Sequence, residues 1–394
     1  MARRPVSARP AIESVPDTDR VALLPITADE KYGPIGGWFF GVATTEDKNV
    51  VFAPFRENVL VMMQNKSFMP VAGAGGGACK WLGAVPGGDG KIYFVPWNSE
   101  AVMALNPIAY ELSEAIPGTP TYIAGAGGSL CKWAGAAKGP DGNIYCAPHN
   151  ADTVLVIHPE TQELSFISLG DAGKAKKKWA GAVAAPDGNI YCAPWDAESV
   201  LVIHPANQEV SFISEAGLEG RSKWFGAALG SDGCVYCAPY NASSVLVVRP
   251  EVVAQVQEGE VQDEENPLAA ALKVDVEVAV EVPVQVWQGE EDRRLNHISG
   301  LGDAFCKWSG AATGADGCIY CSPYNASSVL RIDPESQRLM LLGNLGKEPG
   351  KWFGAALGPE DHVYCAPFNA EAVLTIKTTP FPKDTGKGKG RGRR

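Results

Sequence analysis

The stretch KWFGAALGSDGCVYCAPYNASSVLVVRPE, residues 223–251, decides the fold because the chain repeats it. A near copy, KWSGAATGADGCIYCSPYNASSVLRIDPE, occupies residues 307–335. The core Lys-Trp-x-Gly-Ala recurs with its lysine at Lys80, Lys132, Lys178, Lys223, Lys307 and Lys351. A seventh, degenerate copy contains Gly37-Trp38 in place of Lys-Trp. Self-similarity at a fixed period is the signature of a repeat architecture.

The period and the pattern inside one unit predict a β-propeller. Successive tryptophans of the copies lie 43 to 52 residues apart, except for one interval of 84. Within residues 178–222, the runs KWAGAVAA, IYCAP, SVLVIHP and EVSFISEAG are short, apolar and separated by turns such as Asp-Gly. Four short strands in about 45 residues are typical of a propeller blade. We therefore expect an all-β, seven-bladed β-propeller of four-stranded blades.

The two ends of the chain indicate how the ring closes. The last unit stops after its third strand, residues 372–377, and an apolar run, RVALLPI, stands alone at residues 20–26. We expect this N-terminal strand to complete blade seven. The propeller would then span residues 20–376, between a flexible N-terminal arm, 1–19, and a basic disordered tail, 377–394.

The long interval lies in residues 251–293, which lack the repeat signature. We interpret them as an insertion in blade five, with VPVQVW (282–287) or LNHIS (295–299) supplying the outer strand. A degenerate eighth blade is the alternative.

The net charge of the chain limits the classes of partner that it can bind. The net formal charge is −11, and the tail holds seven basic residues and one acid. Residues 1–376 therefore carry 27 basic and 44 acidic residues, a charge of −17, which does not favour nucleic acid. Only the tail, 377–394, has the charge to contact nucleic acid, and a flexible solubilising end is the simpler interpretation. No apolar run is long enough to span a membrane.

The positions of the ten cysteines indicate the redox state of the cellular compartment. Five share one repeat column, Cys146, Cys192, Cys237, Cys321 and Cys365, in which blades one and two have Phe52 and Phe94. A position that accepts Cys or Phe is a packing position, so we expect free thiols in the cytoplasm or another reducing compartment. The Arg-rich start, MARRPVSARP, leaves organelle targeting as an alternative.

The pattern PDG.IY..P.NA..VL.I.P resembles the NHL, SMP-30/gluconolactonase and virginiamycin B lyase group of propellers. The resemblance implies the fold, whereas the activities within the group differ. Its lactonases would imply a metal held by carboxylates, and its streptogramin lyases a His and a Glu near the axis. The innermost strands here offer no carboxylate, and only His149 stands on a suitable loop. We therefore predict no catalytic residue, no metal and no cofactor.

One face collects the remaining candidate residues. It carries the six lysines and a column of loop side chains, of which we select Trp97, His149, Trp195, Tyr240, Tyr324 and Phe368 for binding. In one interpretation, each lysine pairs with an acid of a neighbouring blade and the aromatics lock the blades. In the other, the lysines form a cationic rim for an anion or an acidic protein segment. We predict a non-catalytic protein-protein interaction platform or structural subunit of a larger assembly. The alternative is a lyase- or lactonase-like enzyme acting on a small molecule.

Overall fold

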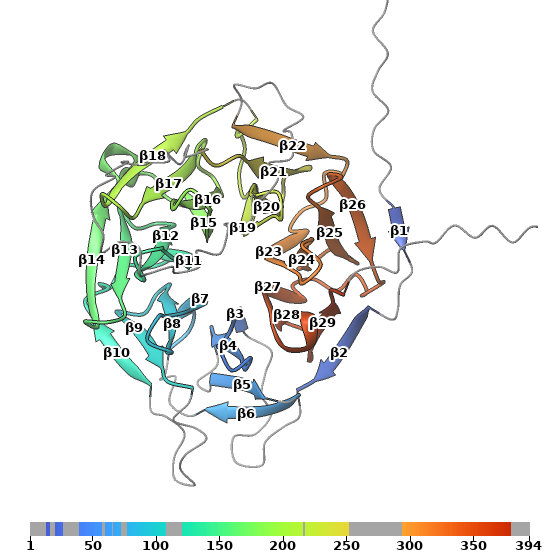
Figure 1. Cartoon of the computed structure of the whole chain (residues 1–394), viewed down its shortest axis with the longest axis horizontal. Helices are drawn as coiled ribbons and strands as arrows, with labels where there is room; N and C mark the ends of the chain where they lie inside the picture. Colours follow the sequence, from blue (N-terminus) through green and yellow to red (C-terminus); the bar gives the residue numbers. More distant parts are fainter. Residues whose placement is uncertain are drawn as a thin grey trace, which may run out of the picture.

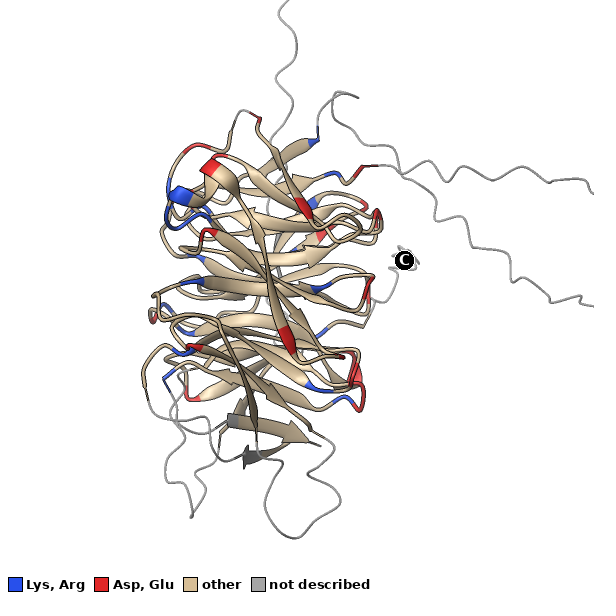
Figure 2. Cartoon of the chain, turned by 90° about the vertical axis from the view of Figure 1, so that its left-hand side faces the viewer, with Lys and Arg blue, Asp and Glu red and all other residues tan. Residues whose placement is uncertain are grey.

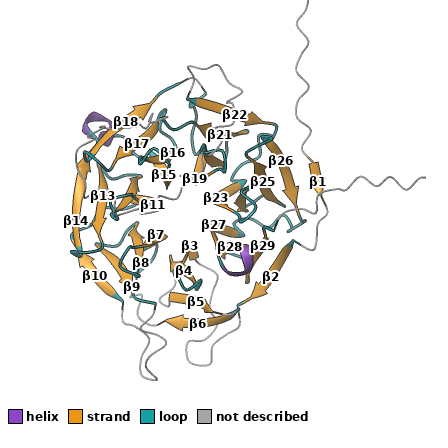
Figure 3. Cartoon of the chain, in the orientation of Figure 1, coloured by secondary structure: helices purple, strands orange, loops and turns teal. Residues whose placement is uncertain are grey.

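The structure is a computed structural model of the chain, and it describes residues 13–15, 20–26, 39–56, 60–64, 66–71, 77–107, 120–215, 217–251 and 294–379. Seven antiparallel blades surround one axis, as predicted, and each has four strands of the regular blade pattern (Figure 1). Strands make up nearly all of the regular structure, beside the short 3-10 helices η2 (Gly170–Lys174) and η4 (Pro359–Asp361) (Figure 3).

The strand bounds, from the innermost to the outermost strand of each blade, are as follows. Blade 1 has β3 (Phe39–Thr44), β4 (Val50–Pro54), β5 (Leu60–Gln64) and β6 (Ser67–Val71). Blade 2 has β7 (Trp81–Pro86), β8 (Ile92–Pro96), β9 (Ala101–Leu105) and β10 (Thr121–Ala124). Blade 3 has β11 (Trp133–Lys138), β12 (Ile144–Pro148), β13 (Thr153–His158) and β14 (Glu163–Ser168). Blade 4 has β15 (Trp179–Ala184), β16 (Ile190–Pro194), β17 (Val200–His204) and β18 (Glu209–Ile213).

The second half of the ring follows the same order. Blade 5 has β19 (Trp224–Leu229), β20 (Val235–Pro239), β21 (Ser244–Val248) and β22 (Leu295–Ser299). Blade 6 has β23 (Trp308–Thr313), β24 (Ile319–Pro323), β25 (Val329–Asp333) and β26 (Arg338–Leu342), with β1 (Glu13–Val15) added as a fifth strand. Blade 7 has β27 (Trp352–Leu357), β28 (His362–Pro367), β29 (Ala372–Lys377) and β2 (Val21–Pro25).

The N-terminal strand closes the ring as the sequence predicted. β2 pairs antiparallel with β29, with Val21 opposite Ile376 and Pro25 opposite Ala372. The Arg20 guanidinium also donates to the Thr379 carbonyl, at 2.9 Å. Within the segment predicted as a flexible arm, β1 pairs parallel with β26. Residues 380–394 of the predicted tail lie outside the described residues.

Blade 5 takes its outer strand from one of the two predicted candidates. β22, the LNHIS run, pairs antiparallel with β21, with Ser244 opposite Ser299. The other candidate and most of the insertion, residues 252–293, lie outside the described residues. Gly226 of blade 5 lies directly against Gly310 of blade 6, so no eighth blade separates them at the axis.

The register of blade 1 corrects one alignment. Phe39 pairs with Pro54 as Trp81 pairs with Pro96, so Phe39 takes the place of the repeat tryptophan. Trp38 therefore aligns with the lysine column, one position earlier than the sequence alignment placed it, and it lies outside the described residues. The error arose because an aromatic triplet, Trp38-Phe39-Phe40, offers two registers.

The core lies between neighbouring blades. One cluster joins Tyr145 and Val154 of blade 3 to Trp179, Cys192 and Leu201 of blade 4. The five cysteines of the repeat column are fully or almost fully buried, which confirms a packing role for the column. All ten cysteines are among the described residues, and all are free thiols. Apolar burial of this kind is the main stabilising term of a fold.

Candidate binding face

Two sets of segments meet on one face of the disc, which we call the KW face. They are the links that enter each innermost strand, with their Lys-Trp pair, and the loops between second and third strands. In blade 4, the Lys178 amide donates to the His149 carbonyl of blade 3 at 3.0 Å. The Lys178 carbonyl accepts from the amide of Trp195, in its own blade, at 2.8 Å. The backbone of the lysine thus joins two adjacent blades, and this arrangement recurs around the ring.

At five of these junctions an Asn or Asp side chain, which was not among the predicted residues, adds a hydrogen bond to the next blade. Asn150 Oδ1 accepts the Lys177 amide of the next blade at 2.9 Å, and Asn241 Oδ1 accepts the Cys306 amide at 2.7 Å. Asn98, Asp196 and Asn325 do the same for Cys131, Ser222 and Gly350. The sequence contains a signal for this hydrogen bond, since the residue after the loop aromatic is Asn or Asp in these blades.

The six lysine side chains point into the protein. They are only 1–6% exposed, although each belongs to the face that the sequence predicted. Lys178 Nζ donates to the carbonyls of Ala151 and Ala175, at 2.7 and 2.9 Å. Each of the other five donates to the carbonyl three residues before it, and three of them lie over the ring of the adjacent tryptophan: Lys80, Lys132 and Lys223.

These contacts give the lysines a structural role that differs from the expected acid pairing. The hydrogen-bond acceptors in these contacts are backbone carbonyls of the links and of the preceding blade. Burial disfavours the charged form and lowers the pKa of Lys132, Lys178 and Lys223 to about 8. Because their side chains are buried, the six lysines do not form the accessible cationic rim that one of the two interpretations expected. A contribution of the lysines to binding stays a prediction.

The loop aromatics converge around the axis in a nearly continuous ring. Ring centroids lie 4.9 Å apart for Trp97 and His149, 4.9 Å for Trp195 and Tyr240, and 5.7 Å for Tyr240 and Tyr324. Tyr324 stacks on Phe368 at 5.8 Å. The structure therefore brings the six predicted loop residues together. Phe55 of blade 1 occupies the same column and is buried.

Three further phenylalanines close the axis beneath this ring, and the sequence analysis did not select them. Phe40 stacks on Phe368, with ring centroids 4.6 Å apart. The ring centroid of Phe353 lies 4.0 Å from that of Phe40 and 4.7 Å from that of Phe225. All three immediately follow the tryptophan column, so the dipeptides Phe-Phe and Trp-Phe were their signal. Below them lies a cavity of about 110 Å³, lined mainly by glycine and alanine of the innermost strands.

His149 is the histidine of the aromatic ring, and its surroundings hold it neutral. Its side chain is buried between Trp97 and Trp195. Nδ1 donates to the Trp179 carbonyl at 3.2 Å, because a carbonyl can only accept. Burial lowers the pKa of His149 to about 4, so the imidazole is uncharged at neutral pH.

The centre of the KW face is apolar and aromatic. Trp97, Trp195, Tyr240, Tyr324 and Phe368 are half-buried. In the links around them, Leu130 is 65% exposed and Phe305 is 74% exposed. Exposed apolar groups of this size on one face commonly mark a protein-binding surface.

The opposite face carries the Asp-Gly turns, and its polar groups have internal partners. The turn aspartate accepts a hydrogen bond from a buried tyrosine four residues later, as in Asp141 and Tyr145 at 2.6 Å and Asp232 and Tyr236 at 2.7 Å. Gln208 of blade 4 donates to the same Tyr145 hydroxyl. Figure 2 shows the disc from the side, with many of its acidic residues in the loops of the right-hand face. The recurring aspartates are thus structural.

No protein-family model matches the chain, and no curated protein does. Solved structures do. A streptogramin B lyase is 12% identical, with a TM-score of 0.65 over 90% of this chain and 96% of the other. A catalytically inactive virginiamycin B lyase from Staphylococcus aureus, with quinupristin, is 10% identical, with a TM-score of 0.65 over 91% and 99%. Hydrazine synthase from Kuenenia stuttgartiensis is 13% identical, with a TM-score of 0.58 over 90% and 97%.

These similarities establish the fold class. The chain is a seven-bladed β-propeller with the architecture of the virginiamycin B lyase-like propellers. Activities differ among the similar structures, and fold alone does not carry function. Among the described residues, no group of three or more His, Cys, Asp or Glu side chains could hold a metal ion. None of the helices in the described ranges has the length and apolarity of a membrane span.

Proposed function

We propose that this propeller is a non-catalytic binding platform that engages partner proteins through the KW face. The observation that carries the proposal is the aromatic ring at the centre of that face, with Leu130 and Phe305 exposed around it. Large aromatic side chains that are partly exposed and held rigidly lose little entropy on binding, and they dominate the energetics of protein interfaces. A scaffold that joins its blades through backbone hydrogen bonds keeps such a surface preformed.

The charge of the link that enters blade 4 favours an acidic partner segment. Lys174, Lys176 and Lys177 are exposed on the link that enters blade 4. Lys174 also pairs with Asp171 at 2.6 Å, and both side chains are largely exposed. Exposed charges of this kind act mainly on the rate of association. Replacing Lys176 and Lys177 by glutamine should slow association with the partner at low salt, with little effect at high salt.

The lyase- or lactonase-like alternative has weaker support. An efficient general base has a pKa near the working pH, whereas His149 has a pKa of about 4. Its Nδ1 is committed to the Trp179 carbonyl, and two tryptophans enclose the ring. The buried lysines are likewise committed to backbone carbonyls.

A site-directed cross-linking experiment tests the proposal. A photoreactive phenylalanine analogue at position 305 should capture a discrete partner from cell extract, identifiable by mass spectrometry. The same analogue at position 357 is the matched control, because Leu357 is 38% exposed at the end of β27 that leads into the opposite face. Equal capture at both positions, or turnover of lactones or streptogramins by the purified chain, would refute the proposal.

A further inference from the structure

The outermost strands share an apolar column at the edge of the disc. Phe166 of β14 lies opposite Leu155, Phe212 of β18 opposite Leu201, and Leu23 of β2 opposite Leu374. Tyr122 of β10 holds the same place opposite Met103. All four side chains are exposed, at 40–50%. In blade 6 the same place belongs to Leu341, opposite Leu330.

In blade 6 an additional strand lies beside this column. There β1 lies parallel to β26, with Ser14 opposite Leu341. Leu341 is half-buried, whereas Leu23, the same residue type at the same register in blade 7, is 50% exposed. Blade 7 has four strands and blade 6 has five. The outer edge of this blade design therefore accepts an additional parallel strand beside the apolar column.

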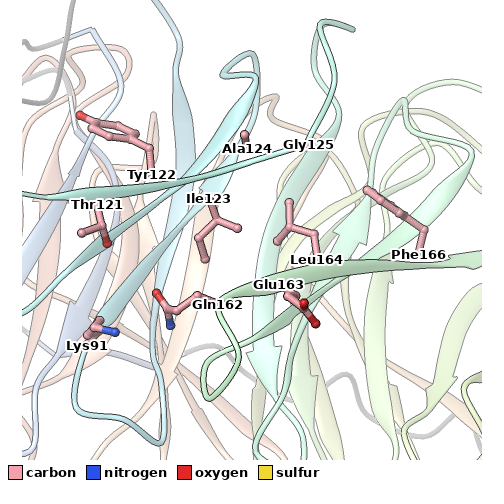
Figure 4. A pocket seen from close by; sticks show the side chains of 10 residues that line it. All are labelled: Lys91, Thr121, Tyr122, Ile123, Ala124, Gly125, Gln162, Glu163, Leu164 and Phe166. Carbon is pink, nitrogen blue, oxygen red and sulfur yellow. The ribbon is translucent and has the colours of Figure 1, made fainter.

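Between blades 2 and 3, the uncovered column borders a groove. The groove has a volume of about 820 Å³ and lies between β10 and the first half of β14. Figure 4 shows Ile123 from β10 and Leu164 from β14 between the two strands, with Phe166 further along β14. Both aliphatic side chains pack against the same buried cluster, so the floor of the groove is fixed by the core.

The polar groups beside the floor are largely paired within the protein. Lys91 Nζ lies 3.0 Å from the Asp89 carboxylate. The Gln162 amide donates to the Tyr93 hydroxyl and to the Pro159 carbonyl. Glu163, at the start of β14, is exposed. The groove therefore offers an uncharged floor and one carboxylate at the end where β14 begins.

We propose that this groove binds an extended peptide segment of a partner protein, which adds as a fifth, parallel strand alongside β14. The main chain of the peptide would bind the edge of β14 that no other described strand occupies, and alternate apolar side chains would cover Ile123, Leu164 and Phe166. A basic residue near the N-terminal end of the peptide would face Glu163, because the added strand runs parallel to β14. The site is separate from the KW face and does not depend on the function proposed there.

Selection from a random peptide library tests this site directly. Phage-displayed 12-residue peptides are selected on the intact protein, and enriched peptides are counter-selected on a Phe166→Asp variant. We expect peptides with alternating apolar residues and a basic residue near the N-terminus. Phe166→Asp should weaken binding at least tenfold. Bound peptide should protect from hydrogen exchange the alternate amides of β14 that point away from β13.

Two controls separate this site from others. Phe212→Asp changes the same column in blade 4, outside the groove, and should leave binding unchanged. Phe305→Asp changes the KW face and should also leave binding unchanged. The proposal fails if no peptide is enriched, if Phe166→Asp binds the enriched peptides as tightly as the unmodified protein, or if Phe212→Asp weakens binding equally.

Discussion

Gly181 of blade 4 lies directly against Gly226 of blade 5, so that a Cβ on Gly181 would stand 2.4 Å from the Gly226 Cα. Each innermost strand contributes one such glycine, and each approaches the next to complete a ring: Gly41, Gly83, Gly135, Gly181, Gly226, Gly310 and Gly354. In all seven blades the strand register shifts by one residue at this point, which is a β-bulge. The glycine of the repeated Gly-Ala is therefore the point at which neighbouring innermost strands come into contact.

Gly181→Ala should destabilise the propeller. Gly181 has a φ of +93°, and the new methyl group would also collide with the backbone of blade 5. Gly188→Ala is the matched control, since Gly188 has a φ of +81° but only Pro140 within 4 Å of an added Cβ. We expect Gly188→Ala to cost about 1 kcal/mol and Gly181→Ala to cost more, measured by urea unfolding. Equal costs would show that the axis tolerates a side chain.

Removing the N-terminal strand should open the ring. Deletion of residues 1–26 takes away β2 and leaves β29 with an unpaired edge, which promotes aggregation. We expect a lower melting temperature and concentration-dependent aggregation in light scattering. Deletion of residues 1–12 is the control, because it keeps both β1 and β2. An unchanged melting temperature after the longer deletion would contradict closure by β2.

Stability should fall as the pH rises above about 9. Burial raises the pKa of Cys234, Cys318 and Cys365 to about 12, whereas an unfolded thiol has a pKa of about 8.5. Between these values the native state holds more protons than the unfolded state, so each thiol lowers the free energy of unfolding by about 1.4 kcal/mol per pH unit.

The buried lysines act in the opposite direction over part of this range. With a pKa of about 8 in the folded state, Lys132, Lys178 and Lys223 add stability as the pH rises towards about 10.4. Burial lowers the pKa of Lys307 and Lys351 as well, and seven buried thiols outnumber these five amines, so the net change is a loss. Urea midpoints under reducing conditions at pH 7.5, 9 and 10 measure it. A constant midpoint would contradict the burial of the thiols.

Lys178→Met should lower the free energy of unfolding, although Lys178 belongs to a surface link. Methionine keeps the length of the side chain but removes the donors for the Ala151 and Ala175 carbonyls. A buried group left without its hydrogen bond costs about 1–3 kcal/mol. Lys351→Met should cost less, because Lys351 Nζ donates to the Glu348 carbonyl, which lies in its own link. The free energies of unfolding of the two variants should differ in this order, and the reverse order would contradict the assigned role.

The sequence predicted the blades well because each unit repeats the same strands and turns. The closing strand was also predictable, because blade 7 lacked an outer strand and residues 20–26 supplied an unpartnered one. The hydrogen-bond acceptors of the lysine side chains could not be predicted, because a backbone carbonyl leaves no pattern in a sequence. The aromatic ring followed from its column, whereas Phe40, Phe225 and Phe353 escaped notice because the same column holds Leu, Ala or Ser in the other blades.

The most direct test of the binding platform is the affinity of its cross-linked partner for two purified variants. The double variant Leu130→Asp/Phe305→Asp changes exposed apolar groups in blades 3 and 6, on the links of the KW face. Leu357→Asp changes an exposed apolar group at the opposite end of blade 7. All three side chains are exposed, so the melting temperatures should stay close to that of the unmodified protein. We predict at least hundredfold weaker binding for the double variant and less than a twofold change for Leu357→Asp. Unchanged affinity in the double variant would contradict binding through the KW face.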